Sequence, residues 1–300
     1  MIRRCFATLV LPVCALHTQA QPVTEIIIIA GQSNARPAYA QGIIAETIAS
    51  GRHPRPTFFH RHHSGNRLEN WVAGTPGHHA LGPNFLTDFW SPDGSADLQK
   101  LIRQLESLGA PWDIAAFYWF QGEADSGGPT ARNLYESRFF FMLDFLEIEF
   151  GLDHDIPFVI TAIDYNGDDE DLARQGRTPE DIDAMRAVQF TIGQARPFGA
   201  AFDSRGWPRL DVWHVGSHAD PRGMYAPVGD LGAAEVRLLQ SLPVPASPAD
   251  LNADGVHDLV DLQGFVRLFR GYDARVDLAA PIQVFDLNDV DAFFLAFTGR

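Results

Sequence analysis

Short apolar runs separated by longer amphipathic stretches fill the chain from residue 21 to about residue 242. The clearest run is 26–29, four isoleucines without polar alternation, which is typical of a strand buried on both faces. Strands that alternate with helices predict a parallel sheet with helices on both of its faces. Further strands are expected at 113–120, 156–163 and 198–203, and helices at 97–108, 133–150 and 179–195.

The segment from about 36 to 90 lacks such a pattern and is rich in Gly, Pro, His and Asn. We expect it to be mostly loop over the edge of the sheet. Its histidines could indicate a metal site, but their spacing is irregular and no cysteine or carboxylate pair is near them. A solvated loop beside a substrate cleft is the preferred interpretation of this group, which consists of His60, His62, His63, His78 and His79.

The pattern changes again after residue 242. SLPVPASPAD at 241–250 contains three prolines, which predicts a stiff, extended linker over 243–249. The remaining residues, 250–300, contain nine aspartates but no glutamate or lysine. Within them DLVDLQGFVRLF (258–269) aligns with DLNDVDAFFLAF (286–297), each with apolar residues at helical spacing. We expect two short helices that pack their aromatic faces together.

Oxygen-bearing side chains before the first of these helices have the spacing of a calcium loop. A hard cation with high coordination requires oxygen ligands at positions 1, 3 and 5, a glycine at position 6 and a carboxylate at position 12. An aspartate-rich turn without calcium is the alternative. The matching residues, at positions 1, 3, 5, 6, 7, 9 and 12, are Asp250, Asn252, Asp254, Gly255, Val256, Asp258 and Asp261.

Residues 249–300 resemble the dockerin-type repeat pair. In that family the module attaches an enzyme to a scaffold or a cell surface, so the resemblance implies structural Ca²⁺ and a partner of this kind. The second half of the module has Ala279, Pro281 and Ile282 where ligands and the glycine would stand. We therefore expect this half to have lost calcium and kept its helix packing.

The first twenty residues have the order of a cleaved secretory signal. Arg3 and Arg4 precede an apolar stretch, and the segment ends in small and polar residues at 18–20. A buried N-terminal helix and a lipid anchor at Cys14 are the alternatives. Cys5 and Cys14 are the only cysteines in the sequence, so the mature chain would have no disulfide and no thiol chemistry.

Charge and hydropathy narrow the location and the partners. No other apolar run approaches the roughly 20 residues of a membrane span, so we expect a secreted, periplasmic or cell-surface protein. The formal net charge is −15, and removing two arginines with the signal makes it −17. Such a surface repels phosphate backbones, so nucleic acid is not an expected partner. Neutral carbohydrate and calcium suit this charge better.

Candidate chemistry follows the first strand. GQSN at 31–34 stands at the carboxyl end of that strand, where open α/β sheets bind ligands. Ser33 is either a turn residue that caps the next helix or a nucleophile, which requires a base oriented by a third group. RLDVWHVGS places Asp211 three residues before His214, a spacing at which the two side chains can meet.

A second polar group follows a middle strand. In YWFQGEAD, at 118–125, Gln121 stands at the polar end of the strand. Its amide could donate a hydrogen bond to a developing oxyanion. The alternatives are that Gln121 is a turn residue and that Glu123 and Asp125 are carboxylates of a loop.

Together, GQSN, WFQGEAD and DVWH resemble the SGNH hydrolases, specifically the branch of sialate O-acetylesterases and carbohydrate esterase family six acetylxylan esterases. MRAVQ at 185–189 and LG at 231–232 are similar to later landmarks of this branch, so the similarity runs from about Glu25 to Leu242. It implies a three-layer, flavodoxin-like α/β/α domain over 21–242. It also implies a serine carbohydrate esterase that removes O-acetyl groups from sugars or polysaccharides without a catalytic cofactor.

The resemblance implies a role for each matching residue. Ser33 would be the nucleophile, His214 the general base and then acid, and Asp211 the group that orients His214. The oxyanion hole would use the backbone N–H groups of Ser33 and Gly82 and the amide of Gln121. Residues expected to contact substrate or support the site are Gln32, Asn34 and Glu123.

Two departures from the family pattern stand out. Ala35, Arg36 and Pro37 follow GQSN, where the family often has Met and a small residue, which is expected to reshape the pocket. The distance from His214 to the LG landmark is long, which leaves His218 as an alternative base. His214 is preferred because only it has an aspartate three residues earlier.

Two other functions fit parts of the pattern. GQSNA nearly matches the GxSxG elbow of α/β-hydrolases, but there the nucleophile follows a mid-sheet strand and its acid and histidine come from separate loops. The chain could also be a secreted carbohydrate-binding or surface-attached protein without turnover. Loss of a triad residue would favour that second reading, and the sequence shows no such loss.

Overall fold

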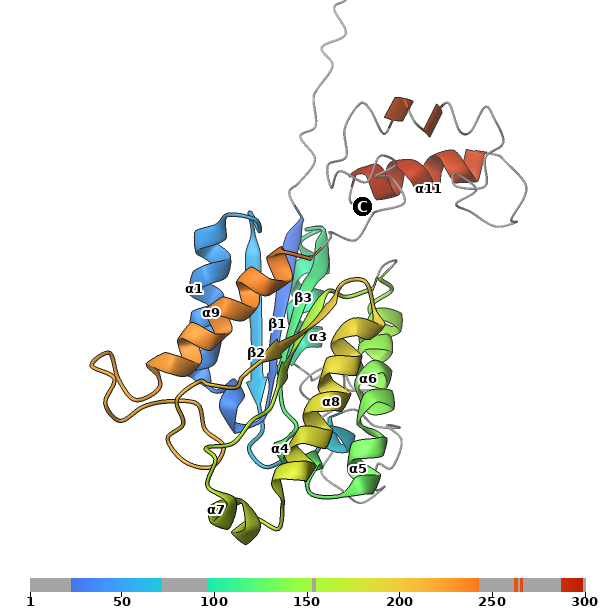
Figure 1. Ribbon diagram of the computed structural model, residues 1–300. Helices are drawn as coiled ribbons and strands as arrows, with labels where there is room; N and C mark the ends of the chain where they lie inside the picture. Colours follow the sequence, from blue (N-terminus) through green and yellow to red (C-terminus); the bar gives the residue numbers. More distant parts are fainter. Residues whose placement is uncertain are drawn as a thin grey trace, which may run out of the picture.

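The computed structural model describes residues 23–71, 97–152, 155–242, 262–263, 265–266 and 287–298 (Figure 1). Several sequence predictions concern residues outside these ranges. They are the signal at 1–20, the linker at 243–249, the second histidine pair (His78 and His79), Gly82 and the calcium ligands between Asp250 and Asp261.

Five parallel strands form a single sheet in the order β2-β1-β3-β4-β5. This order is that of flavodoxin-like sheets, in which ligands bind beyond the carboxyl ends of the strands on either side of the first strand. The predicted α/β fold class is therefore confirmed. The strands are β1 (Thr24–Gly31), β2 (Pro56–His62), β3 (Trp112–Phe120), β4 (Phe158–Ala162) and β5 (Gly199–Asp203).

Helices cover both faces of the sheet (Figure 1). α1 and α9 pack side by side on one face, and α6 and α8 lie together on the other. The longer helices are α1 (Pro37–Ser50), α3 (Asp97–Ser107), α6 (Tyr135–Glu149), α8 (Pro179–Ala195) and α9 (Ala226–Gln240). The short elements are η1 (Ser33–Ala35), η2 (Leu68–Asn70), α4 (Glu123–Ser126), α5 (Pro129–Asn133) and α7 (Asp169–Arg174).

The expectation of loop over 36–90 was wrong for α1 and β2. Pro37 starts α1 at a position where its missing N–H is not needed, and Gly51 ends it in the left-handed conformation with φ of 65°. β2 lies at the edge of the sheet, and most of its side chains are half-exposed. Edge strands tolerate histidine and arginine, so the polar composition of this segment concealed a strand.

The sheet and its helices share one apolar core. All four isoleucines of 26–29 are buried, as predicted for a strand covered on both faces. Trp119 and Phe139 extend the core toward α6 and contact each other edge to face. Among the described residues, no helix is long and apolar enough to cross a membrane.

The C-terminal segment contains α11 (Leu287–Thr298). The ring of Phe293, which is buried, stacks on Phe265 with the ring centroids 3.9 Å apart. Phe265 belongs to the first repeat and Phe293 to the second, so this contact is of the kind expected from the aligned repeats.

Candidate active site

The end of β1 places Ser33 at the carboxyl edge of the sheet. Gly31 has φ of 146°, and a Cβ there would lie 2.1 Å from the carbonyl oxygen of Phe120 on β3. Only glycine fits so close an approach of two backbones. The 3₁₀ turn η1 then begins at Ser33, whose N–H, in the first turn, has no hydrogen-bond partner among the described residues.

Asp211 holds the ring of His214 from one side. Its Oδ2 lies 2.7 Å from Nδ1 of His214, and its Oδ1 accepts backbone N–H bonds from Trp213 and His214. Partial burial alone would raise the pKa of Asp211, but the hydrogen bonds from His214 outweigh it and hold the pKa below its usual value. The carboxylate therefore stays ionised and favours the tautomer with the proton on Nδ1. Nε2 is left to act on another group.

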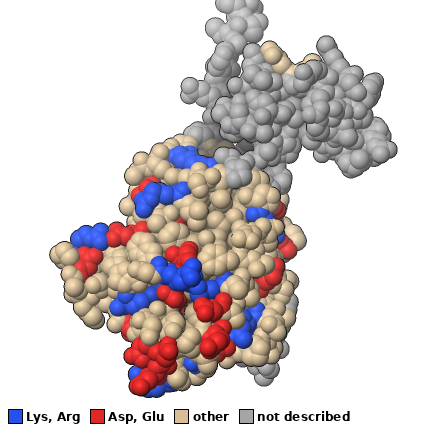
Figure 2. All heavy atoms as spheres, viewed as in Figure 1, with Lys and Arg blue, Asp and Glu red and all other residues tan. Residues whose placement is uncertain are grey.

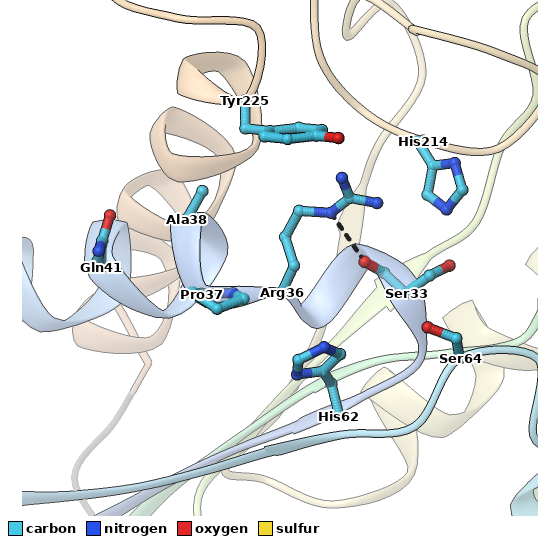
Figure 3. A pocket seen from close by; sticks show the side chains of 9 residues that line it. All are labelled: Ser33, Arg36, Pro37, Ala38, Gln41, His62, Ser64, His214 and Tyr225. Carbon is cyan, nitrogen blue, oxygen red and sulfur yellow. Dashed lines mark hydrogen bonds between the residues drawn. The ribbon is translucent and has the colours of Figure 1, made fainter.

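A cavity of about 690 Å³ brings Ser33 and His214 together. Figure 3 shows the two side chains pointing toward one another across it. Ser64, just beyond β2, and His62, the last residue of β2, line the adjoining wall. The remaining wall comes from the start of α1 and from the residue before α9, namely Arg36, Pro37, Ala38, Gln41 and Tyr225.

Asn34 connects the turn that contains Ser33 to the loop that contains His214. Its side chain is buried and makes three hydrogen bonds. Nδ2 donates to the carbonyl oxygen of Trp213 at 3.0 Å and to Oε1 of Glu123 at 2.8 Å, and Oδ1 accepts the N–H of Val215 at 3.0 Å. The backbone on both sides of His214 is thus fixed to the residue after Ser33. Asn34 supports the site and does not line the cavity.

Gln32 and Glu123 also lie behind the cavity. Oε1 of Gln32 accepts the backbone N–H groups of Gly122 and Ala124, both at 3.2 Å. Glu123 is buried, and burial raises the pKa of its carboxyl group despite the hydrogen bond from Asn34. Of the two alternatives given for these residues, the geometry favours support of the site over contact with substrate.

The side-chain amide of Gln121 is engaged in hydrogen bonds within the protein. Its Nε2 donates to Oδ2 of Asp125 at 2.6 Å and to the carbonyl oxygen of Asn66 at 3.2 Å, and the whole side chain is buried. Both amide hydrogens are therefore engaged, and Gln121 does not line the cavity. An oxyanion role for this amide, as the resemblance implied, has no support in this geometry.

Further predictions for the site can be placed on the structure. His218 is exposed and does not line the cavity, whereas His214 does. His60 and His62 belong to β2 and stack on each other with centroids 5.4 Å apart. Burial, followed by the charge of His60, lowers the pKa of His62. The described residues contain no group of three or more metal-ligating side chains.

Sequence reasoning missed several residues of the cavity wall. Ser64 follows an edge strand that the sequence did not reveal, and Tyr225 has no motif around it. Arg36 was noted only as a departure from the family pattern. Its Nε donates to the carbonyl oxygen of Ser33 at 2.9 Å, and its guanidinium lies 4.2 Å from the centroid of the Tyr225 ring.

Comparisons with known proteins give only distant likenesses. No family model matches the chain, and no curated protein matches it. A solved structure of a protein from Arabidopsis thaliana is 14% identical, with 73% of this chain and 99% of that one covered and a TM-score of 0.48. Est24, a carbohydrate acetylesterase from Sinorhizobium meliloti, is 11% identical over 73% of this chain and 99% of that one, with a TM-score of 0.42. An aryl esterase of M. smegmatis is also 11% identical, over 73% of this chain and 100% of that one, with a TM-score of 0.41.

Proposed function

We propose that the protein is a serine esterase that uses Ser33, His214 and Asp211. The observation that carries this proposal is the shared cavity. Ser33 and His214 are distant in sequence, yet both line it, and Asp211 binds the far side of the His214 ring at 2.7 Å. A hydroxyl, an imidazole and a carboxylate in this order are the components of nucleophilic acyl transfer.

The chemistry then follows from these side chains. Oγ of Ser33 attacks the ester carbonyl as Nε2 of His214 takes its proton, and Asp211 stabilises the imidazolium that forms. The backbone N–H of Ser33 donates a hydrogen bond to the oxyanion. His214 protonates the departing alcohol, and water activated by the same imidazole releases the acid from the acyl-enzyme. These steps require only groups of this chain, the ester and water.

For the substrate, we propose O-acetyl groups on sugars or polysaccharides. The resemblance of GQSN, WFQGEAD and DVWH to acetylesterases of carbohydrates supports this class, and the cavity is far larger than an acetyl group. The leader-like residues 1–20 support export of the protein. We further propose that the segment after residue 250 binds Ca²⁺ and attaches the enzyme to a scaffold or a cell surface.

Hydrolysis of 4-nitrophenyl acetate tests the proposal, followed by acetate release from acetylated xylan and O-acetylated sialic acid. We expect Ser33→Ala to lower kcat by at least about 10³-fold. Asp211→Asn should lower it by about 10³- to 10⁴-fold, because the imidazole would adopt the wrong tautomer. His218→Ala is the matched control and should retain activity.

A carbohydrate-binding protein without turnover is the second candidate. The observation that favours it is Gln121, whose amide donates to Asp125 and Asn66. Of the three expected oxyanion donors, only the N–H of Ser33 is then without a partner among the described residues. Wild type and Ser33→Ala would then be equally inert on every ester. If wild type and Ser33→Ala also bound a sugar specifically and with equal affinity, a carbohydrate-binding function would become the preferred interpretation.

A further inference from the structure

Arg36 is an unusual residue to find beside a nucleophilic serine. Among the described residues it forms no ion pair, in a chain whose acidic residues outnumber Lys and Arg by 38 to 23. Arg222, between His214 and α9, is by contrast bound by Asp220 at 2.9 Å and by Asp230 at 2.6 Å. The missing carboxylate at Arg36 is therefore not explained by a shortage of acidic residues.

Two contacts hold the Arg36 side chain in one position. Nε donates to the carbonyl oxygen of Ser33 at 2.9 Å, and the guanidinium stacks on the Tyr225 ring at 4.2 Å. Neither contact uses the two terminal nitrogens. Figure 3 shows these nitrogens directed into the space between Tyr225, Ser33 and His214. A fixed guanidinium whose two terminal nitrogens have no hydrogen-bond partner among the described residues presents a fork that matches a carboxylate.

The part of the cavity wall that the described residues form carries no negative charge. None of these lining residues is aspartate or glutamate. Pro37 and Ala38 bring the N-terminal end of α1, with its partial positive charge, to the same wall. An anion entering the cavity would therefore meet attraction from the guanidinium and from the helix end, with no opposing carboxylate on the wall.

We propose that Arg36 makes the site selective for acetylated sugars that carry a carboxylate, such as uronic acids. This inference rests on the proposed esterase activity and deepens it. The carboxylate of the sugar binds the two terminal nitrogens of Arg36 while the ester carbonyl lies at Ser33. Arg36 and Ser33 both line the cavity of about 690 Å³, so one bound sugar can contact both residues.

The test compares two substrates that differ only in charge. One is a mono-O-acetylated methyl galacturonoside, and the other is its uronamide, which has the same shape without the negative charge. Acetate release gives kcat/KM for each. We expect wild type to prefer the carboxylate at least tenfold, mainly through KM, and the preference to shrink as ionic strength rises from about 0.05 to 0.5 M.

Variants assign the preference to Arg36. Arg36→Gln should reduce the ratio of the two kcat/KM values to near one, and Arg36→Lys, which lacks the planar fork, should give an intermediate ratio. Arg237→Gln removes the same charge from the far end of α9, where Arg237 pairs with Glu46 at 2.9 Å, and should keep the full preference. No preference in wild type, or a preference that Arg36→Gln retains, would overturn the proposal.

A separate measurement distinguishes this proposal from the esterase proposal. If 4-nitrophenyl acetate and both sugars are not hydrolysed, the esterase proposal fails, and calorimetric titration of wild type with unacetylated methyl galacturonoside decides the role of Arg36. Binding that Arg36→Gln weakens at least tenfold would still support a carboxylate site. Equal binding to both proteins, or none to wild type, would overturn it.

Discussion

At the scale of single residues, Asn34 shows how a buried amide can join two segments of the proposed site without lining its cavity. Its three hydrogen bonds join the turn of Ser33 to Trp213 and Val215, on either side of His214. Buried polar groups that lose a partner cost about 1–3 kcal/mol each. Removal of this side chain would thus release the loop that carries His214 and leave its partners unsatisfied.

We expect Asn34→Ala to lower kcat by about 10²-fold, because a displacement of about 1 Å between Ser33 and His214 is enough for such a loss. KM for 4-nitrophenyl acetate should change little. The assay should be run below the melting temperature of the variant, with Asn133→Ala, an exposed position at the end of α5, as control. A lower melting temperature with unchanged kcat would show that Asn34 serves packing alone.

At the scale of elements, the pair α1 and α9 determines where Arg36 and Tyr225 meet, because each residue immediately precedes one of these helices. The two helices approach with backbone against backbone. A Cβ on Gly42 of α1 would lie 1.9 Å from the carbonyl oxygen of Gly229 on α9. The stacking of Arg36 on Tyr225 therefore depends on a glycine one turn and a half inside α1.

Gly42→Ala tests this approach. Alanine gains about 1 kcal/mol of helix propensity, but the clash with a backbone atom forces the helices apart, and overpacking typically costs about 1–3 kcal/mol or more. We expect net destabilisation, measured by urea unfolding, and a reduced preference for anionic substrates. Gly128→Ala, where a Cβ meets nothing within 4 Å, should be close to neutral. Equal stability of the Gly42 variant and wild type would contradict the close packing.

Below this helix pair, α9 buries Glu235 against α1 and the sheet. Tyr39 and Thr161 donate hydrogen bonds to its two carboxyl oxygens. Burial raises its pKa from 4.5 to about 8. Between these values the folded protein holds a proton that the unfolded chain has lost, so the free energy of unfolding falls as pH rises, by up to about 1.4 kcal/mol per pH unit.

Glu235→Gln should remove this decrease in the free energy of unfolding with rising pH. The variant is expected to be more stable than wild type at pH 8, with a difference that shrinks toward pH 5, where the wild-type carboxyl group is neutral in the folded protein. Urea unfolding at several pH values measures both curves, and Glu136→Gln, at an exposed position on α6, is the control. If the free energy of unfolding changed with pH in the same way for the Glu235 variant and wild type, the buried carboxyl group of Glu235 would be ionised in the folded protein.

Helices and strands could be predicted from the sequence where their burial requires apolar residues at regular positions. The runs that became the central strands β1, β3 and β4 are apolar because both sheet faces are covered. The edge strand β2 was missed because its composition is polar, whereas β5, at the other edge, has the apolar sequence GAAFD and was predicted. α1 was missed because its apolar residues do not form a single stripe and glycine interrupts it. The sequence pattern therefore indicates which residues are buried on regular elements, but it can miss a polar edge strand or a helix without a single apolar stripe.

At the scale of the whole molecule, the candidate site was predictable only in part. The spacing of Asp211 and His214 is local, so the sequence could indicate that contact. The engagement of Gln121 by Asp125 depends on a turn, α4, that begins right after the strand, and strand-end position alone could not reveal it. The meeting of Arg36 and Tyr225 needs the packing of two helices distant in sequence, which no motif encodes. The position of the Arg36 guanidinium in the cavity wall thus depends on packing between segments distant in sequence.

Charges of both signs are mixed over the face of the molecule shown in Figure 2. Residues 250–300 contain nine aspartates and four arginines, with no glutamate or lysine, and so have a net negative charge. If calcium neutralises part of that charge and the chemistry needs only Ser33, His214 and Asp211, metal binding and catalysis should be separable in the intact chain. The carboxylate at position 12 of the first loop, Asp261, is the residue to change.

We expect calorimetry of the full chain to show Ca²⁺ binding that Asp261→Ala abolishes. At a Ca²⁺ concentration 100 times Kd, binding should stabilise wild type by about 2.7 kcal/mol. Asp289→Ala changes the corresponding residue of the second repeat and should leave binding intact, because Ala279, Pro281 and Ile282 stand where that repeat would need ligands and the glycine. Ester hydrolysis should be the same with calcium and with a chelator, since Ca²⁺ takes no part in activating Ser33. Loss of hydrolysis in chelator, reversed by Ca²⁺, would instead place a calcium-dependent step within the catalytic cycle.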